Sequence, residues 1–218
     1  TGSRQVCSEG RAAAPSVCRR RTAWPALRGA NQLANAAGVL AAVTASHQRL
    51  PVTAQAIRTG LALVELTGRC QTVPGRPTLV LDVAHNPHSA RALAANLDGM
   101  GYYPATHAVC GAMADKDTAQ MLQTLHPLID HWYFTDLPTT RAASAHTLQE
   151  QWRAVCAHQA PKLTPPTSRT FPTPAQALQA ALAAADPADR IVVFGSFHTV
   201  GAILESGLPV LAPPHITP

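Results

Sequence analysis

Four polar side chains that could bind an anion or a sugar follow one short apolar run: Asp82, His85, Asn86 and His88. The run, residues 78–83, is rich in leucine and β-branched residues, which is typical of a buried strand. The carboxylate of Asp82 could accept hydrogen bonds from ribose hydroxyls or from an adenine amine. Alternatively, Asp82 and Asn86 could serve only to hydrogen-bond backbone N–H groups of the turn.

The residues after this turn predict a helix. Asn86 is a favoured N-cap residue and Pro87 a favoured first helical residue. Apolar residues then recur with the spacing of one buried helical face, at Ala90, Leu93, Ala94 and Leu97. A helix that begins at the carboxyl end of a strand directs free N–H groups and roughly half a positive charge outward, so phosphates and carboxylates bind there.

Two further strand-to-helix turns carry polar side chains. The turn 111–117 places Lys116 between two aspartates, where the ammonium group could reach a carboxylate or a phosphate. It could equally be a solvated lysine beside an aspartate that caps the next helix. In the turn 194–198, Ser196 can cap the following helix, and Ser196 with His198 can offer donors to a carboxylate.

Metal and disulfide chemistry are not favoured by the residue types. His85 and His88 lie three residues apart and could ligate a metal with Asp82, but imidazoles near a helix N-terminus more often bind anions or pack. The five cysteines are scattered, odd in number and form no Cys-x-x-Cys pair, which argues against a zinc site and a disulfide framework. We therefore expect no metal ligands in this chain and a reducing compartment, the cytoplasm.

Charge and hydropathy exclude two classes of partner. The net charge of +5 comes from residues 1–28, which hold six arginines against one glutamate. The remaining 190 residues carry 11 basic and 11 acidic side chains, so no basic face is expected for nucleic acid. No apolar run approaches the ~20 residues of a membrane span. A hydrophobic content of 46% is enough for one substantial core.

Strands and helices alternate from residue 78 onward, which predicts an α/β fold. After the strand at 78–83, strands are predicted at 105–111, 130–135 and 190–194, and helices from 87, at 117–126, 145–158 and 175–185, and from 196, with a proline-rich loop at 161–174. The alternation predicts a three-layer domain whose mostly parallel sheet has helices on both faces. Ligands bind such sheets outside the carboxyl ends of the strands.

The segment before residue 69 has a different character. Residues 1–22 show no apolar periodicity and predict an unstructured or non-native stretch. A helix is predicted over 31–45, and Thr53 can cap a second short helix that ends near Gly60.

Three motifs in this order resemble the C-terminal domain of the bifunctional dihydrofolate synthase/folylpolyglutamate synthases of the Mur ligase superfamily. They are the segments 66–71, 81–90 and 193–200, and the resemblance extends over about 25–213. It implies a ligase that uses ATP and Mg²⁺ to join L-glutamate to dihydropteroate or to a folate γ-carboxylate through an acyl phosphate.

The resemblance also implies roles for individual residues. The residues implied to bind ATP are Asn35, Arg69 and Asp82. Those assigned to glutamate or another anion are His85, Asn86, His88, Lys116, Ser196 and His198. Arg69 could instead form a surface ion pair. No residue of this chain is implied to be catalytic, and the magnesium ligands of the family lie upstream of the matched region.

The resemblance divides the chain into three parts. Residues 1–22 would be disordered or non-native, 23–68 the helical remnant of a central ATP-binding domain with a linker, and 69–218 the glutamate-ligase domain. The sequence has no Gly-x-x-x-x-Gly-Lys-Ser/Thr motif, the loop that cradles ATP phosphates, and no Gly-x-Gly-x-x-Gly motif of dinucleotide-binding dehydrogenases. Because the phosphate-binding loop is missing, we expect this chain to be inactive by itself. We also expect it to be a monomer. The alternative is a non-catalytic domain that retains weak nucleotide or amino-acid binding.

Overall fold

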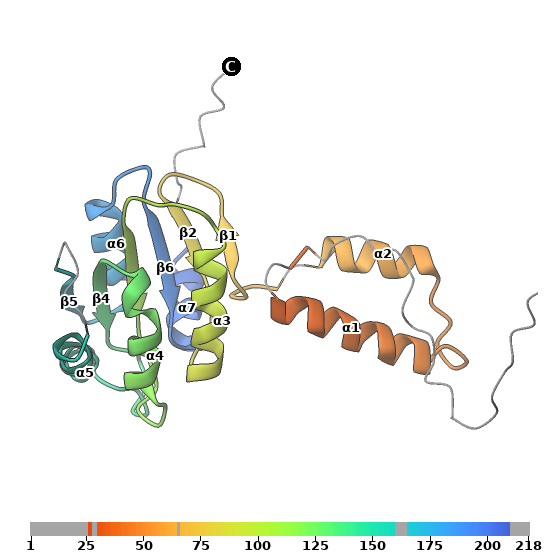
Figure 1. Cartoon of the computed structure of the whole chain (residues 1–218), viewed down its shortest axis with the longest axis horizontal. Helices are drawn as coiled ribbons and strands as arrows, with labels where there is room; N and C mark the ends of the chain where they lie inside the picture. Colours follow the sequence, from red (N-terminus) through yellow and green to blue (C-terminus); the bar gives the residue numbers. More distant parts are fainter. Residues whose placement is uncertain (1–25, 28–29, 65, 160–164, 210–218) are drawn as a thin grey trace, which may run out of the picture. The chain divides into compact units, whose positions relative to one another are not determined.

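The computed structural model describes residues 26–27, 30–64, 66–159 and 165–209 (Figure 1). They divide into two compact units, the first containing Ala26 and residues 34–64 and the second containing residues 27, 30–33 and 66–209. The predicted unstructured segment 1–22 lies outside the described residues.

The first unit is helical. Helix α1 spans Ala30–Ala45 and helix α2 spans Ala54–Leu63. Thr53 caps α2 as predicted, because its hydroxyl accepts a hydrogen bond from Ala56 N at 3.1 Å. The helix continues three residues beyond Gly60, the predicted end, and none of its residues is buried.

The second unit contains a six-stranded sheet with the order β1-β2-β6-β3-β4-β5. The strands are β1 (Gln71–Val73), β2 (Thr78–Leu81), β3 (Thr106–Cys110), β4 (His131–Thr135), β5 (Thr167–Phe171) and β6 (Arg190–Phe194). All neighbouring strands are parallel except β1, which pairs with β2 in the antiparallel sense. The sheet confirms the predicted α/β class.

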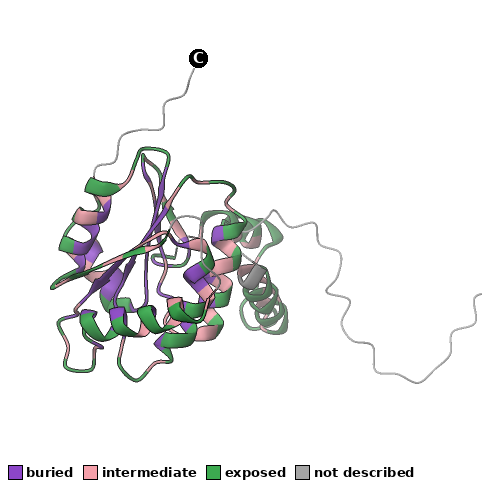
Figure 2. Ribbon diagram, turned by 60° about the vertical axis from the view of Figure 1, so that its left-hand side comes forward, coloured by how far each residue is buried: buried purple, intermediate pink, exposed green. Residues whose placement is uncertain are grey.

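Helices cover both faces of this sheet (Figure 1). They are α3 (Pro87–Asp98), α4 (Thr118–Leu125), a short 3₁₀ turn (His126–Leu128), α5 (Ala145–Ala157), α6 (Pro174–Ala184) and α7 (Phe197–Glu205). One core forms under α3, α4 and α5 and includes Leu93, Leu97, Leu122, Trp152, Val80 and Phe134. The other forms under α6 and α7 and includes Ala177, Leu178, Val200, Ile203, Leu81 and Val193. The central strands β2, β3, β4 and β6 are mostly buried, while the outward helix surfaces are exposed (Figure 2).

Two strands were not expected from the sequence. The proline-rich stretch 161–174 was predicted to be a loop, and this prediction is wrong for Thr167–Phe171, which forms β5. β5 is an edge strand with mostly exposed or half-buried residues, so it lacks the apolar run that marks the central strands. β1 has three residues and lies at the opposite edge.

The amino edge of the sheet holds a buried histidine. Nε2 of His107 lies 3.3 Å from Oδ2 of Asp189, and Nδ1 lies 3.1 Å from the hydroxyl of Tyr133. The ring of His131 lies 4.6 Å from that of His107 between centroids. Burial lowers the pKa of His107 below its ordinary value of 6.5, and repulsion from His131 lowers it further, while Asp189 and Asp130 oppose the shift.

This lowered pKa makes the stability of the second unit depend on pH. The unfolded chain takes up a proton near pH 6.5, whereas the folded chain keeps His107 neutral to lower pH. The free energy of unfolding should therefore decrease as the pH falls below about 6.5. His107→Gln should flatten this dependence, measured by urea unfolding between pH 7.5 and 5.0. The exposed His88→Gln serves as the control, and a slope unchanged in His107→Gln would contradict the assignment.

Candidate functional site

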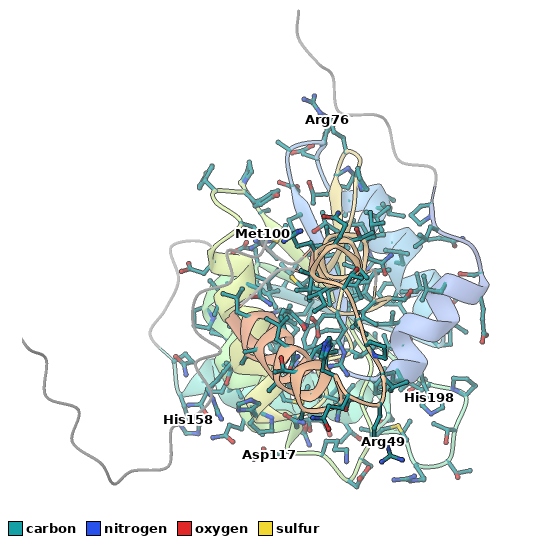
Figure 3. All side chains as sticks on the ribbon, turned by 90° about the vertical axis from the view of Figure 1, so that its right-hand side faces the viewer. Arg49, Arg76, Met100, Asp117, His158 and His198 are labelled. Carbon is teal, nitrogen blue, oxygen red and sulfur yellow. The ribbon has the colours of Figure 1, made fainter. Side chains whose placement is uncertain are left out.

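Three strand-to-helix turns meet at the carboxyl edge of the sheet. β6 lies between β2 and β3, so the turns 82–86, 111–117 and 195–196 are neighbours. Hydrogen bonds connect them, since Gly195 N donates to Ala84 O at 2.9 Å and the Thr199 hydroxyl donates to Gly111 O at 2.6 Å. Asp117 and His198 lie toward this end of the molecule, opposite Arg76 and Met100 (Figure 3). The predicted grouping of the three turns is therefore what the fold produces.

A close approach between two glycines allows this arrangement. Gly195 has a φ of +109°, a conformation that residues with a Cβ rarely adopt. A Cβ built at Gly195 would lie 2.5 Å from Gly111 O. Both the backbone conformation and the space therefore require glycine where β6 turns into α7.

The Asp82 carboxylate connects two turns through backbone hydrogen bonds. Its Oδ2 accepts from Cys70 N at 2.8 Å, and its Oδ1 accepts from Ala84 N at 2.8 Å. The backbone-satisfying role that the sequence left open is thus present. Each carboxylate oxygen can accept a second hydrogen bond, so these contacts still leave acceptor capacity for a ligand.

The electrostatic environment of Asp82 combines burial with compensation. Burial raises the pKa of Asp82 above its ordinary value of 3.8. The hydrogen bonds from Cys70 N and Ala84 N oppose this rise, as does the positive charge of Arg69. The charged form of Asp82 therefore depends on the two N–H groups that it holds.

Arg69 lies on the turn that Asp82 fixes. Gly68 has a φ of +70° and Cys70 a φ of +49°, so both residues flanking Arg69 are in the left-handed region. Val83 N donates to Gly68 O at 2.8 Å, which anchors the other side of the turn. Arg69 itself is exposed, and its guanidinium carbon lies 6.0 Å from the centroid of the Phe197 ring.

His85 also points its ring toward Phe197. Its Nδ1 lies 2.9 Å from Val83 O, so Nδ1 carries the hydrogen and Nε2 is the acceptor of the neutral ring. The centroids of the His85 and Phe197 rings are 5.9 Å apart. The structure therefore brings Arg69 and His85, from two different turns, to the same aromatic side chain.

The N-terminus of α3 has fewer free donors than the sequence suggests. Asn86 is its N-cap as predicted and accepts from Ser89 N at 2.9 Å. Pro87 has no N–H, and the Ser89 hydroxyl accepts from both His85 N and Asn86 N at 3.1 Å. Within the part of the chain that the structure describes, the N–H of His88 is left as the unbonded donor of the first turn. An anion here would depend on side chains more than on the helix end.

Lys116 lies in an exposed group of charges on the turn after β3. Its Nζ is 3.0 Å from Oδ2 of Asp115, and Nη2 of Arg141 is 3.7 Å from the same oxygen. Asp117 caps α4 by accepting from Gln120 N at 3.1 Å. The hydrogen bond from Lys116 is the main reason why the pKa of Asp115 is below its ordinary value. Arg141 was not predicted as a site residue, because it follows a different strand from Lys116.

The remaining predicted site residues lie in different surroundings. Ser196 is buried, and its hydroxyl accepts from His198 N at 2.9 Å and Thr199 N at 3.3 Å, so it caps α7. The side chain of His198 is exposed at the same turn. Asn35 is an exposed residue of α1 in the first unit. The ligand roles of all three stay predictions.

Two kinds of feature are absent from the described residues. Among them, no group of three or more histidines, cysteines or acidic residues is arranged to hold a metal ion. In the same part of the chain, no helix has the length and apolar character needed to cross a membrane.

Comparison with known proteins places the chain in a family. Residues 68–197 match the family model described as Mur ligase, glutamate ligase domain. The match includes the three turns 82–86, 111–117 and 195–196. The chain therefore belongs to the Mur ligase family, in its glutamate ligase domain.

Individual relatives are more specific than the family model. The chain is 38% identical over 171 residues to a dihydrofolate synthase/folylpolyglutamate synthase from Escherichia coli, covering 78% of this chain and 37% of that protein. It is similar to the E. coli FolC structure in complex with DHPP and ADP, with a TM-score of 0.70, covering 79% of this chain and 38% of that one. The chain spans less than two fifths of the length of these relatives.

The chain is also similar to a solved structure that has small ligands bound. It is a bifunctional folylpolyglutamate synthase/dihydrofolate synthase with Mn, AMPPNP and L-glutamate bound. Its TM-score to this chain is 0.70 at 35% identity, covering 85% of this chain and 41% of that one.

Because Gly195 lies against Gly111, we expect an alanine substitution to destabilise the protein at Gly195 but not at Gly201. Gly195→Ala should lower the free energy of unfolding by about 2 kcal/mol or more, because it combines backbone strain with a steric conflict. Gly201→Ala on α7 is the matched control, since nothing lies within 4 Å of a Cβ there. It should be neutral or stabilising by up to about 1 kcal/mol. Equal stability of the two variants in urea unfolding would contradict the assigned role of Gly195.

Proposed function

We propose that this chain is part of an ATP-dependent ligase that adds L-glutamate to dihydropteroate, to the γ-carboxylate of folates, or to both, through an acyl phosphate. In this proposal the chain supplies the glutamate site and part of the nucleotide site. The family match and the relatives named above support the ligase class.

The observation that carries the proposal is the meeting of three polar turns at one sheet edge. Asp82 with Arg69 and Lys116 with Arg141 form two charged groups there. Asp82 and Lys116 lie on the turns after β2 and β3, whereas Arg69 precedes β1 and Arg141 follows β4. A ligase of this class must hold an anionic nucleotide and an anionic amino acid at once. Two charged groups on neighbouring turns meet that requirement.

We assign the nucleotide to the first group. Arg69 would pair with phosphate oxygens, because a guanidinium binds phosphate with two parallel hydrogen bonds. Asp82 would accept from ribose hydroxyls or an adenine amine with the lone pairs that its backbone contacts leave. The resemblance implies that Asn35 of α1 would be a further nucleotide ligand.

We assign glutamate to the second group and to the histidines of the edge. Lys116 would pair with a glutamate carboxylate, in competition with Asp115. His85 Nε2, the His88 N–H and the exposed ring of His198 would supply further polar contacts, with Asn86 and Ser196 holding the helix ends.

The contribution of these residues to the reaction is positioning. ATP supplies the phosphoryl group that activates the acceptor carboxylate. The side chains of this chain would orient the glutamate amine for attack on the carbonyl carbon of the acyl phosphate, from which inorganic phosphate leaves, and this positioning lowers the entropic barrier. The described residues do not form a magnesium site, so we assign no step of the metal to them. The missing phosphate-loop motif likewise favours binding over phosphoryl transfer by this sequence.

The two assignments predict opposite selectivities for two substitutions. Asp82→Ala should weaken ADP binding by roughly tenfold or more, because it removes charged hydrogen bonds and releases Arg69, with little effect on L-glutamate. Lys116→Ala should weaken L-glutamate binding about fivefold, the size of an exposed ion pair, with little effect on ADP. Titration of the purified chain, followed by amide chemical shifts, measures both.

The controls test charge and location. Lys116→Gln should not restore glutamate binding, because it keeps a donor without the charge. Asp98→Ala, at the exposed end of α3, should leave both affinities unchanged. Equal effects of Asp82→Ala and Lys116→Ala on both ligands would show that the turns are misassigned. No binding of either ligand to the unsubstituted chain would overturn the proposed site.

A further inference from the structure

Phe197 is an exposed aromatic residue at the centre of the candidate site. It is the first residue of α7, and 61% of its surface is accessible. Its backbone is fixed on both sides, because Gly195 N donates to Ala84 O and buried Ser196 caps the helix. A rigidly held and largely exposed phenyl ring contributes little to the core, so its packing does not explain its presence there.

The ring is the meeting point of two side chains that could bind an anion. The Arg69 guanidinium carbon lies 6.0 Å from the ring centroid, within the range of a cation–π contact. The His85 ring lies 5.9 Å away at an interplanar angle of 42°. Within the described residues, no ion pair joins Arg69 to a carboxylate. The phenyl ring is thus an aromatic face within reach of the guanidinium, on which the charge of Asp82 also acts.

A contact that orients the Arg69 side chain matters for ligand binding because this side chain is long and exposed. Such a side chain loses much rotamer entropy when a ligand fixes it, and this loss weakens binding if the side chain is free beforehand. A ring that holds the guanidinium over one spot lowers this cost before the ligand arrives. Asp82 fixes the backbone of the same residue through Cys70 N, so both ends of Arg69 are restrained.

We propose that Phe197 is a positioning residue whose ring holds the Arg69 guanidinium toward an anion. The ligand that fits is the polyphosphate of a nucleotide, and this part rests on the proposed function. Phe197 then acts on nucleotide affinity through Arg69 and not through the stability of the fold.

A double-mutant cycle on the full chain, with ADP as the probe, tests this role. Phe197→Leu should weaken ADP binding about two- to fivefold, the size of an exposed cation–π contact, and Phe197→Tyr should retain the affinity. In an Arg69→Ala background, Phe197→Leu should have no further effect, since the residue it orients is gone. The thermal midpoint of Phe197→Leu should match that of the unsubstituted chain. An equal loss in both backgrounds, or a loss that Phe197→Tyr shares, overturns the proposal.

A second measurement does not depend on nucleotide binding. The ring current of Phe197 should shift the NMR signal of the Arg69 Nε–H group. This shift should disappear in Phe197→Leu and persist in Phe197→Tyr. If ADP does not bind to the unsubstituted chain but this pattern is seen, the nucleotide assignment fails and the positioning contact stands. An Arg69 signal that is the same in Phe197→Leu overturns the contact itself.

Discussion

The Asp82 carboxylate is the group on which the geometry of the candidate site depends. By accepting from Cys70 N and Ala84 N, it joins the turn that carries Arg69 to the turn that begins α3. Burial of this carboxylate raises its pKa, and the two N–H groups offset part of that cost. The same contacts give two backbone donors a hydrogen-bond acceptor. The position of Arg69 therefore depends on the Asp82 carboxylate, whose own position is set by strand β2.

The order of the strands extends this local arrangement to the whole edge. β6 enters the sheet between β2 and β3, and its helix α7 packs on the face opposite to α3 and α4. Neighbouring strands whose helices leave on opposite faces open the edge to ligands. Gly195 and Gly111 let the turns of β6 and β3 approach at backbone distance. Phe197 follows directly, so the aromatic ring reaches both Arg69 and His85.

The sequence predicted those features whose cause is local. The apolar run of β6, the Asn86 and Pro87 start of α3 and the Thr53 cap of α2 were all recognisable from residue type and spacing. Edge strand β5 was missed because its partly exposed residues show no apolar run, and pairing with β4 alone defines it. The contact of Asp82 with Cys70 N and the meeting of Arg69 with Phe197 join residues distant in sequence, so only the fold reveals them.

Amide hydrogen exchange in an Asp82→Asn variant tests the central role of this carboxylate most directly. Asparagine keeps the shape but offers one acceptor oxygen, so one of the two backbone donors must lose its partner. The amide of Cys70 or of Ala84 should then exchange roughly tenfold faster or more, while the amides of β6 keep their protection. Unchanged exchange at both Cys70 and Ala84 would show that Asp82 does not hold the Arg69 turn.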